Sequence, residues 1–177
     1  TSTQLASKVE EMLIQAVIKD GEKVIFRDVK DENSGQTYNL TVAQYIAYDL
    51  GSDNLGFSNE LYTKILQEAV EHCGEEGFKA EEYFTQHADI NIASVAVRLS
   101  VDRFQLAESL QVKETEQTLR DRVIHLVADF RLEYVSSHLK ELNERLLQVK
   151  DSQEMQEIMS KIMRTQNLRN ELAKKTG

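Results

Sequence analysis

The sequence LRDRVIHLVADFRLEYVSSHLKELNERLLQ, residues 119–148, decides the fold of this chain. Its apolar residues recur at intervals of three and four, which is the spacing of a packed helix. We place this helix over residues 114–149, with a break near residues 150–152 and a second helix returning beside it as far as residue 175. The first helix would span roughly 54 Å at 1.5 Å per residue. A single body of this size is about 30 Å across, so much of the helix should extend beyond it.

The apolar stripe of this long helix does not stay on one face. Its phase shifts between Phe130 and Val135, just before the pair Ser136 and Ser137. We therefore expect the first half of the helix to pack on the rest of the chain and the second half on the returning helix. The core of this helical hairpin should consist of Leu139, Leu142, Leu146 and Val149 from the first helix and Ile158, Ile162 and Leu172 from the second.

Composition favours a mostly helical globular protein. The chain has 177 residues, of which 41% are hydrophobic and 29% charged, and it contains no proline, the residue that helix interiors exclude most strongly. The formal charge is −9, which argues against binding to the phosphates of duplex DNA. One cysteine fits a reducing cytoplasm, and no apolar run approaches the roughly 18 residues that would span a membrane.

The first part of the chain predicts a bundle of short helices with one β-hairpin. A helix is expected over residues 4–19, a β-hairpin over 22–42, and a capping box from Thr41 to Gln44 at the next helix. Ser58 is expected to cap the helix after that, and residues 80–87 and 90–97 to form two more, whereas residues 102–110 could be helical or irregular. The expected fold is thus mainly α: a helical-bundle body over residues 1–135, including half of the long helix, and a helical hairpin over 136–177.

Sequence motifs for chemistry are missing. No glycine-rich phosphate loop occurs, and the acidic turn that begins at Asp31 lacks the glycine and glutamate positions of a calcium-binding EF-hand loop. His72 and Cys73 are adjacent, so their side chains should point apart on a helix. His87 and Asp89 are too few to hold a metal ion without further ligands. We therefore predict no catalytic, metal-binding or cofactor-binding residues in this chain.

The returning helix carries a row of methionines. Met155, Met159 and Met163 recur every four residues beside the apolar residues Ile158 and Ile162, so the apolar surface is wider than one facing helix covers. Methionine suits a surface that adapts to a partner, but it also fills irregular gaps in a core. From the residues alone, partner binding and packing inside the helical hairpin are equally good explanations of this row.

The order of segments resembles the C-terminal helicase-binding domain of bacterial DnaG-type primases. The segments that carry the resemblance are KVEEMLIQAVIKDGEKVI (8–25), FSNELYTKILQEAVEHCGEEG (57–77), EEYFTQHADINIASVAV (81–97), the long helix quoted above and RTQNLRNELAKKTG (164–177). The likeness spans nearly the whole chain but is diffuse, except at the NELAKK segment. The expected β-hairpin departs from the all-helical pattern of that family.

The resemblance implies a cytoplasmic domain that docks primase onto the N-terminal domains of the replicative DnaB-type helicase. Primer synthesis would belong to other regions of the parent enzyme, and this domain would need no cofactor. The expected contact surface consists of Met155, Met159, Met163, Arg164, Leu168 and Arg169. Two alternatives remain: the N-terminal domain of the helicase itself, which has a similar body, and a free-standing helical adaptor.

Overall fold

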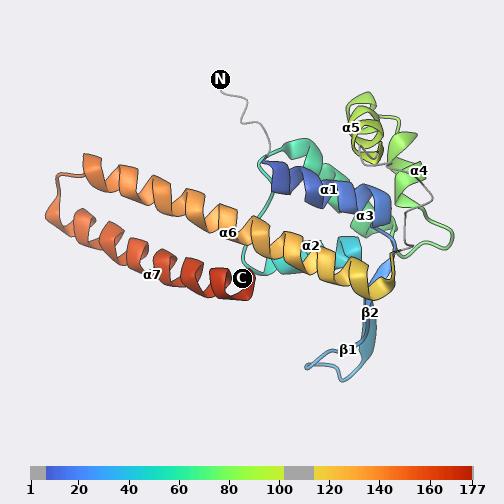
Figure 1. Cartoon of the computed structure of the whole chain (residues 1–177), viewed down its shortest axis with the longest axis horizontal. Coiled ribbons are helices and arrows are strands. Elements are labelled where there is room, and N and C mark those ends of the chain that lie inside the picture. The colour runs from blue at the N-terminus through green and yellow to red at the C-terminus, as the bar shows by residue number, and fades with distance from the viewer. Residues whose placement is uncertain (1–6, 102–113, 177) are drawn as a thin grey trace. The chain divides into compact units, whose positions relative to one another are not determined.

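A computed structural model describes residues 7–101 and 114–176. The described elements are α1 (Lys8–Asp20), β1 (Val24–Lys30), β2 (Thr37–Thr41), α2 (Val42–Ser52), α3 (Glu60–His72), α4 (Ala80–Thr85), α5 (Ile90–Ser100), α6 (Glu116–Gln148) and α7 (Ser152–Thr176) (Figure 1). The predicted mainly helical fold with one small β-hairpin and two long C-terminal helices is confirmed. The segment 102–110, expected to be helical or irregular, lies outside the described residues.

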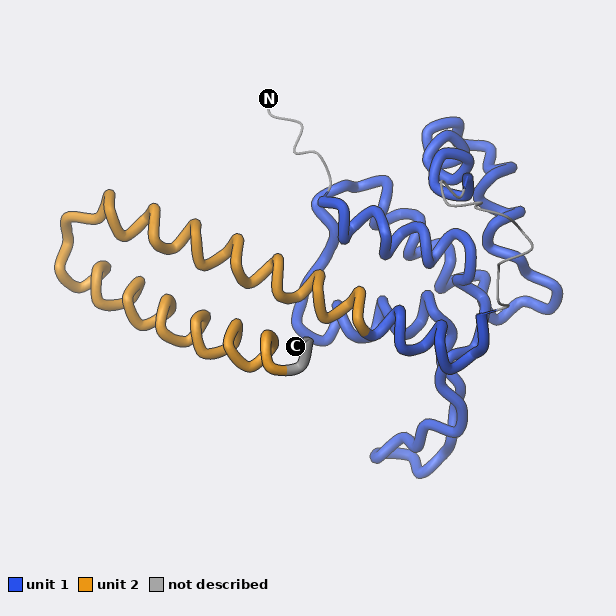
Figure 2. The backbone as a smooth tube through the Cα atoms, viewed as in Figure 1, with its two compact units in different colours: residues 1–124 blue, residues 125–177 orange. Residues whose placement is uncertain are grey.

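The chain forms two compact units, residues 1–124 (unit 1) and residues 125–177 (unit 2) (Figure 2). The dividing point lies within α6, so one continuous helix belongs to both units. The expected boundary between the helical-bundle body and the helical hairpin, after residue 135, stays a prediction.

Helix α1 provides the centre of unit 1. It contacts α2, α3, α4 and α5, and its residues Leu13, Ile14, Val17 and Ile18 are fully buried. These four positions are spaced by one, three and one residues, so they cover a broad apolar face. Ser7 caps the helix by accepting the Glu10 N–H at 3.1 Å. A helix with a broad apolar face can hold several short helices around one core.

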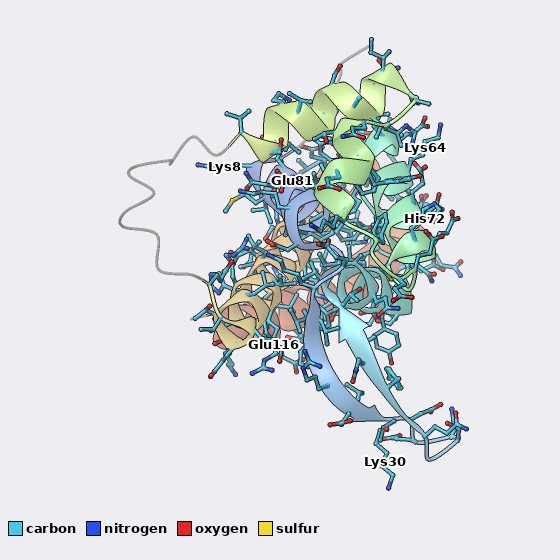
Figure 3. The ribbon with its side chains drawn as sticks, turned by 90° about the vertical axis from the view of Figure 1, so that its right-hand side faces the viewer. Lys8, Lys30, Lys64, His72, Glu81 and Glu116 are labelled. Atoms are coloured by element: carbon cyan, nitrogen blue, oxygen red, sulfur yellow. The ribbon has the colours of Figure 1, made fainter. Side chains whose placement is uncertain are left out.

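The β-hairpin is held at its base and exposed at its outer end. Its strands pair antiparallel from Val24 with Thr41 to Lys30 with Thr37, with two irregularities between these pairs. Residues 32–39 are all exposed, and Figure 3 shows Lys30 near the outer end. The base is attached to α6, where the Arg120 guanidinium donates to the Ile25 carbonyl at 3.1 Å. The β-hairpin projects from the helical body of unit 1 (Figure 1), although a two-stranded sheet alone is only marginally stable in water.

Helices α1, α2, α3 and α5 of unit 1 start with side-chain caps, whereas α4 does not. The predicted capping box is present: the Gln44 N–H donates to Thr41 Oγ1 at 3.2 Å, and the Thr41 N–H donates to Gln44 Oε1 at 3.0 Å. The expected cap of α3 is wrong, because Asn59 and not Ser58 accepts the Leu61 N–H, at 2.9 Å. The Ser58 hydroxyl instead donates to the buried Glu10 carboxylate of α1.

Helix α6 changes its buried face along its length, at the place where the sequence pattern shifts. Its first stripe is buried at Leu119, Val123, Leu126 and Phe130. A second stripe is buried from Val135 onward, at Leu139 and Leu142. The helix itself is continuous through this change, because both stripes keep spacings of three and four residues.

Candidate partner-binding surface on the helical hairpin

The helical hairpin of unit 2 has a small core of its own. Leu139 and Leu142 of α6 pack with Ile158 and Ile162 of α7, and Leu146 and Val149 lie partly buried against this cluster. Asp151 starts the second helix by accepting the Gln153 N–H at 3.3 Å. Of the residues expected in the core, Leu172 is half-buried and lies outside this cluster.

The methionine row, Met155, Met159 and Met163, lies beside this core and is increasingly exposed. The exposed fractions of the three side chains are 37%, 50% and 65%. Each step of four residues turns roughly 40° further round a helix of 3.6 residues per turn. Ile158 and Ile162 are also four residues apart, so Met159 and Met163 run alongside them, each roughly 100° further round the helix, and the row forms an exposed apolar strip on one flank of α7.

The other expected contact residues do not share this flank. Leu168 is 48% exposed, but it lies roughly 140° round the helix from Met163. Arg164 is exposed, whereas Arg169 is half-buried. The residues expected to bind a partner are thus spread round α7, with the methionine row on one flank of the seam and Leu168 on the other.

Charge is distributed unevenly along α7. Glu154, Glu157 and Lys161 lie in its first half, whereas Arg164 at its midpoint is followed in the second half by Arg169, Glu171 and Lys174. Negative charge near a helix N-terminus and positive charge toward its C-terminus both favour the helix dipole. The methionine row therefore extends from an acidic end of the helix toward a basic one.

One exposed apolar residue of unit 2 was not identified from the sequence. Leu147 of α6 is 88% exposed, although it stands between Leu146 and Gln148 in a leucine-rich segment. Its position one residue after the half-buried Leu146 turns it roughly 100° away from the core, so the helical period predicts this exposure. Leu147 is an exposed apolar residue on α6, so it can serve as a control position for substitutions in the methionine row on α7.

The titratable groups of unit 1 form hydrogen-bond networks. Glu68 Oε1 accepts the Tyr83 hydroxyl at 2.8 Å and pairs with His87 Nε2 at 2.9 Å, while the Asp89 N–H donates to His87 Nδ1 at 2.9 Å. Burial raises the pKa of Glu68, but the hydrogen bonds from His87 and Tyr83 outweigh it and keep that pKa below its usual range. Burial, followed by the hydrogen bond to Glu68, raises the pKa of Tyr83 to about 12. Both ring nitrogens of His87 are thus engaged within the fold.

The remaining residues considered for chemistry also serve the fold. His72 Nδ1 pairs with Glu75 at 2.8 Å, whereas the Cys73 thiol donates to the Val70 carbonyl at 3.2 Å, so the two neighbours have separate partners. Asp31 accepts the Asn33 N–H and the Ser34 hydroxyl in the turn of the β-hairpin, and the Asn33 hydrogen bond in particular lowers the pKa of Asp31. Across the described part of the chain, no three His, Cys, Asp or Glu side chains are grouped to hold a metal ion.

These features define a mainly helical protein with a bundle unit and a helical hairpin whose second helix carries an exposed apolar strip. Among the described helices, none is both long and apolar enough to cross a membrane. The chain belongs to the family described as a domain of unknown function, DUF8430, which it matches over residues 1–177. Comparison with curated proteins and with solved structures finds no match.

Proposed function

We propose that this chain is the helicase-interaction domain of a bacterial DNA primase. It would dock primase onto the replicative DnaB-type helicase in the cytoplasm during primer synthesis. The domain itself would be non-catalytic and free of cofactors, and the parent enzyme would supply the nucleotidyltransferase activity. Two findings support this function. One is the resemblance of the segments quoted above, and the other is the exposed methionine row on a helical hairpin that has its own core.

The physical support comes from the chemistry of the row. Methionine side chains are flexible and polarizable, so a row of them can adapt to the shape of a partner. Exposed apolar strips are uncommon away from interaction sites, and a few central apolar anchors supply most of the affinity of a typical interface. Met159 and Met163, the two most exposed members of the row, are the anchors that we assign.

The basic residues beside Met163 would assist the encounter. Lys161 and Arg164 lie in the same turns of the helix as Met163. Charges at the rim of an interface mainly raise the association rate and make it sensitive to salt. The proposed partner surface is therefore an apolar groove or strip with acidic residues at its edge.

Calorimetry with the N-terminal domains of the helicase from the same organism tests this function. We expect saturable binding at low salt that weakens as salt is added, because screening removes the contribution of the basic residues. Absence of binding at low salt would contradict the proposal and favour a free-standing adaptor.

A further inference from the structure

Unit 1 contains an apolar groove that the proposed function does not use. It has a volume of about 440 Å³ and is lined by residues of α2, of α3 and of the segment between them. The two helices contact each other. Its apolar lining includes Leu50 from α2, Leu55 and Phe57 from the connecting segment, and Leu66 and Val70 from α3. Glu71 is the one charged residue in this lining. Binding sites in proteins commonly have this combination of apolar walls and few polar groups.

Gly51 of α2 keeps the groove open. Glycine weakens a helix relative to alanine, and it is usually required only where the backbone needs a positive φ or a close approach. Neither applies here: the positive φ after α2 belongs to Asn54, and a Cβ placed on Gly51 would meet no atom within 4 Å. Gly56, which also lines the groove, has the same open space. Neither the backbone conformation nor the packing requires these two glycines. Because they have no side chain, the groove is wider at Gly51 and Gly56 than it would be with larger residues.

The segment that supplies most of the groove lining is acidic. Glu71 lines the groove, and the segment from Gly51 to Glu71 also contains Asp53 and Glu60 against the single basic residue Lys64, while Glu68 is bound to Tyr83 and His87. The exposed Tyr48 lies three residues before Gly51, on the adjoining part of the α2 surface. Tyrosine is one of the residue types that most often anchor interfaces. The groove thus combines an apolar floor, an exposed aromatic side chain and negative charge.

We propose that this groove docks a cationic amphipathic helix of a partner protein. Apolar side chains spaced by three and four residues would enter between α2 and α3, as in other helix-in-groove complexes. Lysine or arginine residues beside them would face Glu71 and the acidic segment. This site belongs to unit 1, whereas the proposed helicase contact belongs to unit 2, so either can fail without the other.

The test uses a fluorescent helical peptide with leucine at every third or fourth position and lysine elsewhere. A matched peptide has glutamate in place of lysine. Fluorescence anisotropy measures the dissociation constant of each peptide for the wild-type chain, for Gly51→Leu, which fills the groove, and for Glu71→Gln. Gly74→Leu is the control, because a Cβ at Gly74 also meets no atom within 4 Å but Gly74 does not line the groove.

We expect Gly51→Leu to weaken binding of the lysine peptide by about tenfold or more and Gly74→Leu to change it by less than about twofold, because only the former removes a pocket for an anchor residue. Glu71→Gln should weaken binding less, and the glutamate peptide should bind poorly. In wild-type protein, methyl NMR signals of Leu50, Leu66 and Val70 should shift with the lysine peptide. Equal affinity of both glycine variants, equal binding of both peptides, or methyl shifts confined to other residues would overturn the proposal.

Discussion

At the scale of single residues, Glu10 links two helices of unit 1. It lies on α1 and is only 4% exposed, and its carboxylate accepts the Asn59 N–H at 3.2 Å and the Ser58 hydroxyl at 3.0 Å. A buried carboxylate is costly unless it is hydrogen-bonded, and the first N–H groups of a helix need acceptors. Glu10 therefore satisfies the Asn59 N–H at the start of α3 from a distance of 49 residues in sequence.

Replacing Glu10 by alanine should lower the free energy of unfolding by about 1–3 kcal/mol, because the Asn59 N–H and the Ser58 hydroxyl lose their acceptor. Urea denaturation followed by circular dichroism measures this change. Glu11→Ala is the matched control, since Glu11 makes a partly exposed ion pair with Arg98 that should contribute at most about 1 kcal/mol. Equal effects of the two variants would contradict the role of Glu10.

Tyr83 gives the fold a dependence on alkaline pH. Its pKa is raised to about 12 in the folded chain, above the value of about 10 for an unfolded tyrosine. The folded state therefore keeps this proton more tightly, and the associated stability is complete below pH ~10 and lost between pH ~10 and ~12. Tyr83→Phe should reduce the loss of stability in that window, as measured by urea denaturation at a series of pH values, whereas Tyr48→Phe, at an exposed site, should leave it unchanged. An identical alkaline profile for wild type and Tyr83→Phe would count against this linkage.

At the scale of elements, local signals predicted the helices well. The long helix expected over 114–149 spans Glu116–Gln148. It was predictable because apolar residues recur with the helical period over about nine turns. The capping box at Thr41 was predictable for a similar reason, since both of its partners lie within four residues. The cap of α3 was not predictable, because the competing role of Ser58 depends on Glu10, which is distant in sequence.

The sites were less predictable than the helices. Periodicity located the methionine row, but not the rise in exposure from Met155 to Met163, which depends on where α6 lies beside α7. The groove between α2 and α3 could not be predicted from a sequence motif, because its lining residues come from two helices and the segment that connects them. In the sequence Gly51 indicates only the end of a helix; the open space beside it is a property of the tertiary structure.

Helix α2 should be stabilised by replacing its glycine. Gly51→Ala adds a methyl group into open space and removes the helix penalty of glycine, so the free energy of unfolding should rise by about 0.5–1 kcal/mol. Gly77→Ala is the contrasting variant, since Gly77 has a φ of +78° and alanine there should be destabilising. Thermal unfolding of both variants measures the difference. A loss of stability in Gly51→Ala would show that the glycine is needed for folding and would remove the reason to assign it to an open groove.

At the scale of the whole molecule, the two units have cores of different size. The core of unit 1 draws on α1 to α5, whereas that of the helical hairpin consists of four buried residues and two partly buried ones. Fewer buried contacts imply a lower free energy of local opening. Hydrogen exchange followed by mass spectrometry should therefore show faster exchange of α7 than of α1, with opening near Ser136 and Ser137 before global unfolding. Equal protection of the two helices would contradict this separation.

The most direct test of the docking function compares two double variants of unit 2 in calorimetry with the N-terminal domains of the helicase. Met159→Asp with Met163→Asp places charges on the exposed row, while Leu147→Asp with Gln153→Asp adds the same charge at exposed positions outside the proposed contact. We expect the methionine variant to bind about tenfold more weakly or worse, since it removes two central anchors, and the control variant to retain nearly the wild-type affinity. Circular dichroism should show that both remain folded. Unchanged affinity of the methionine variant would contradict the assignment of the row as the helicase contact.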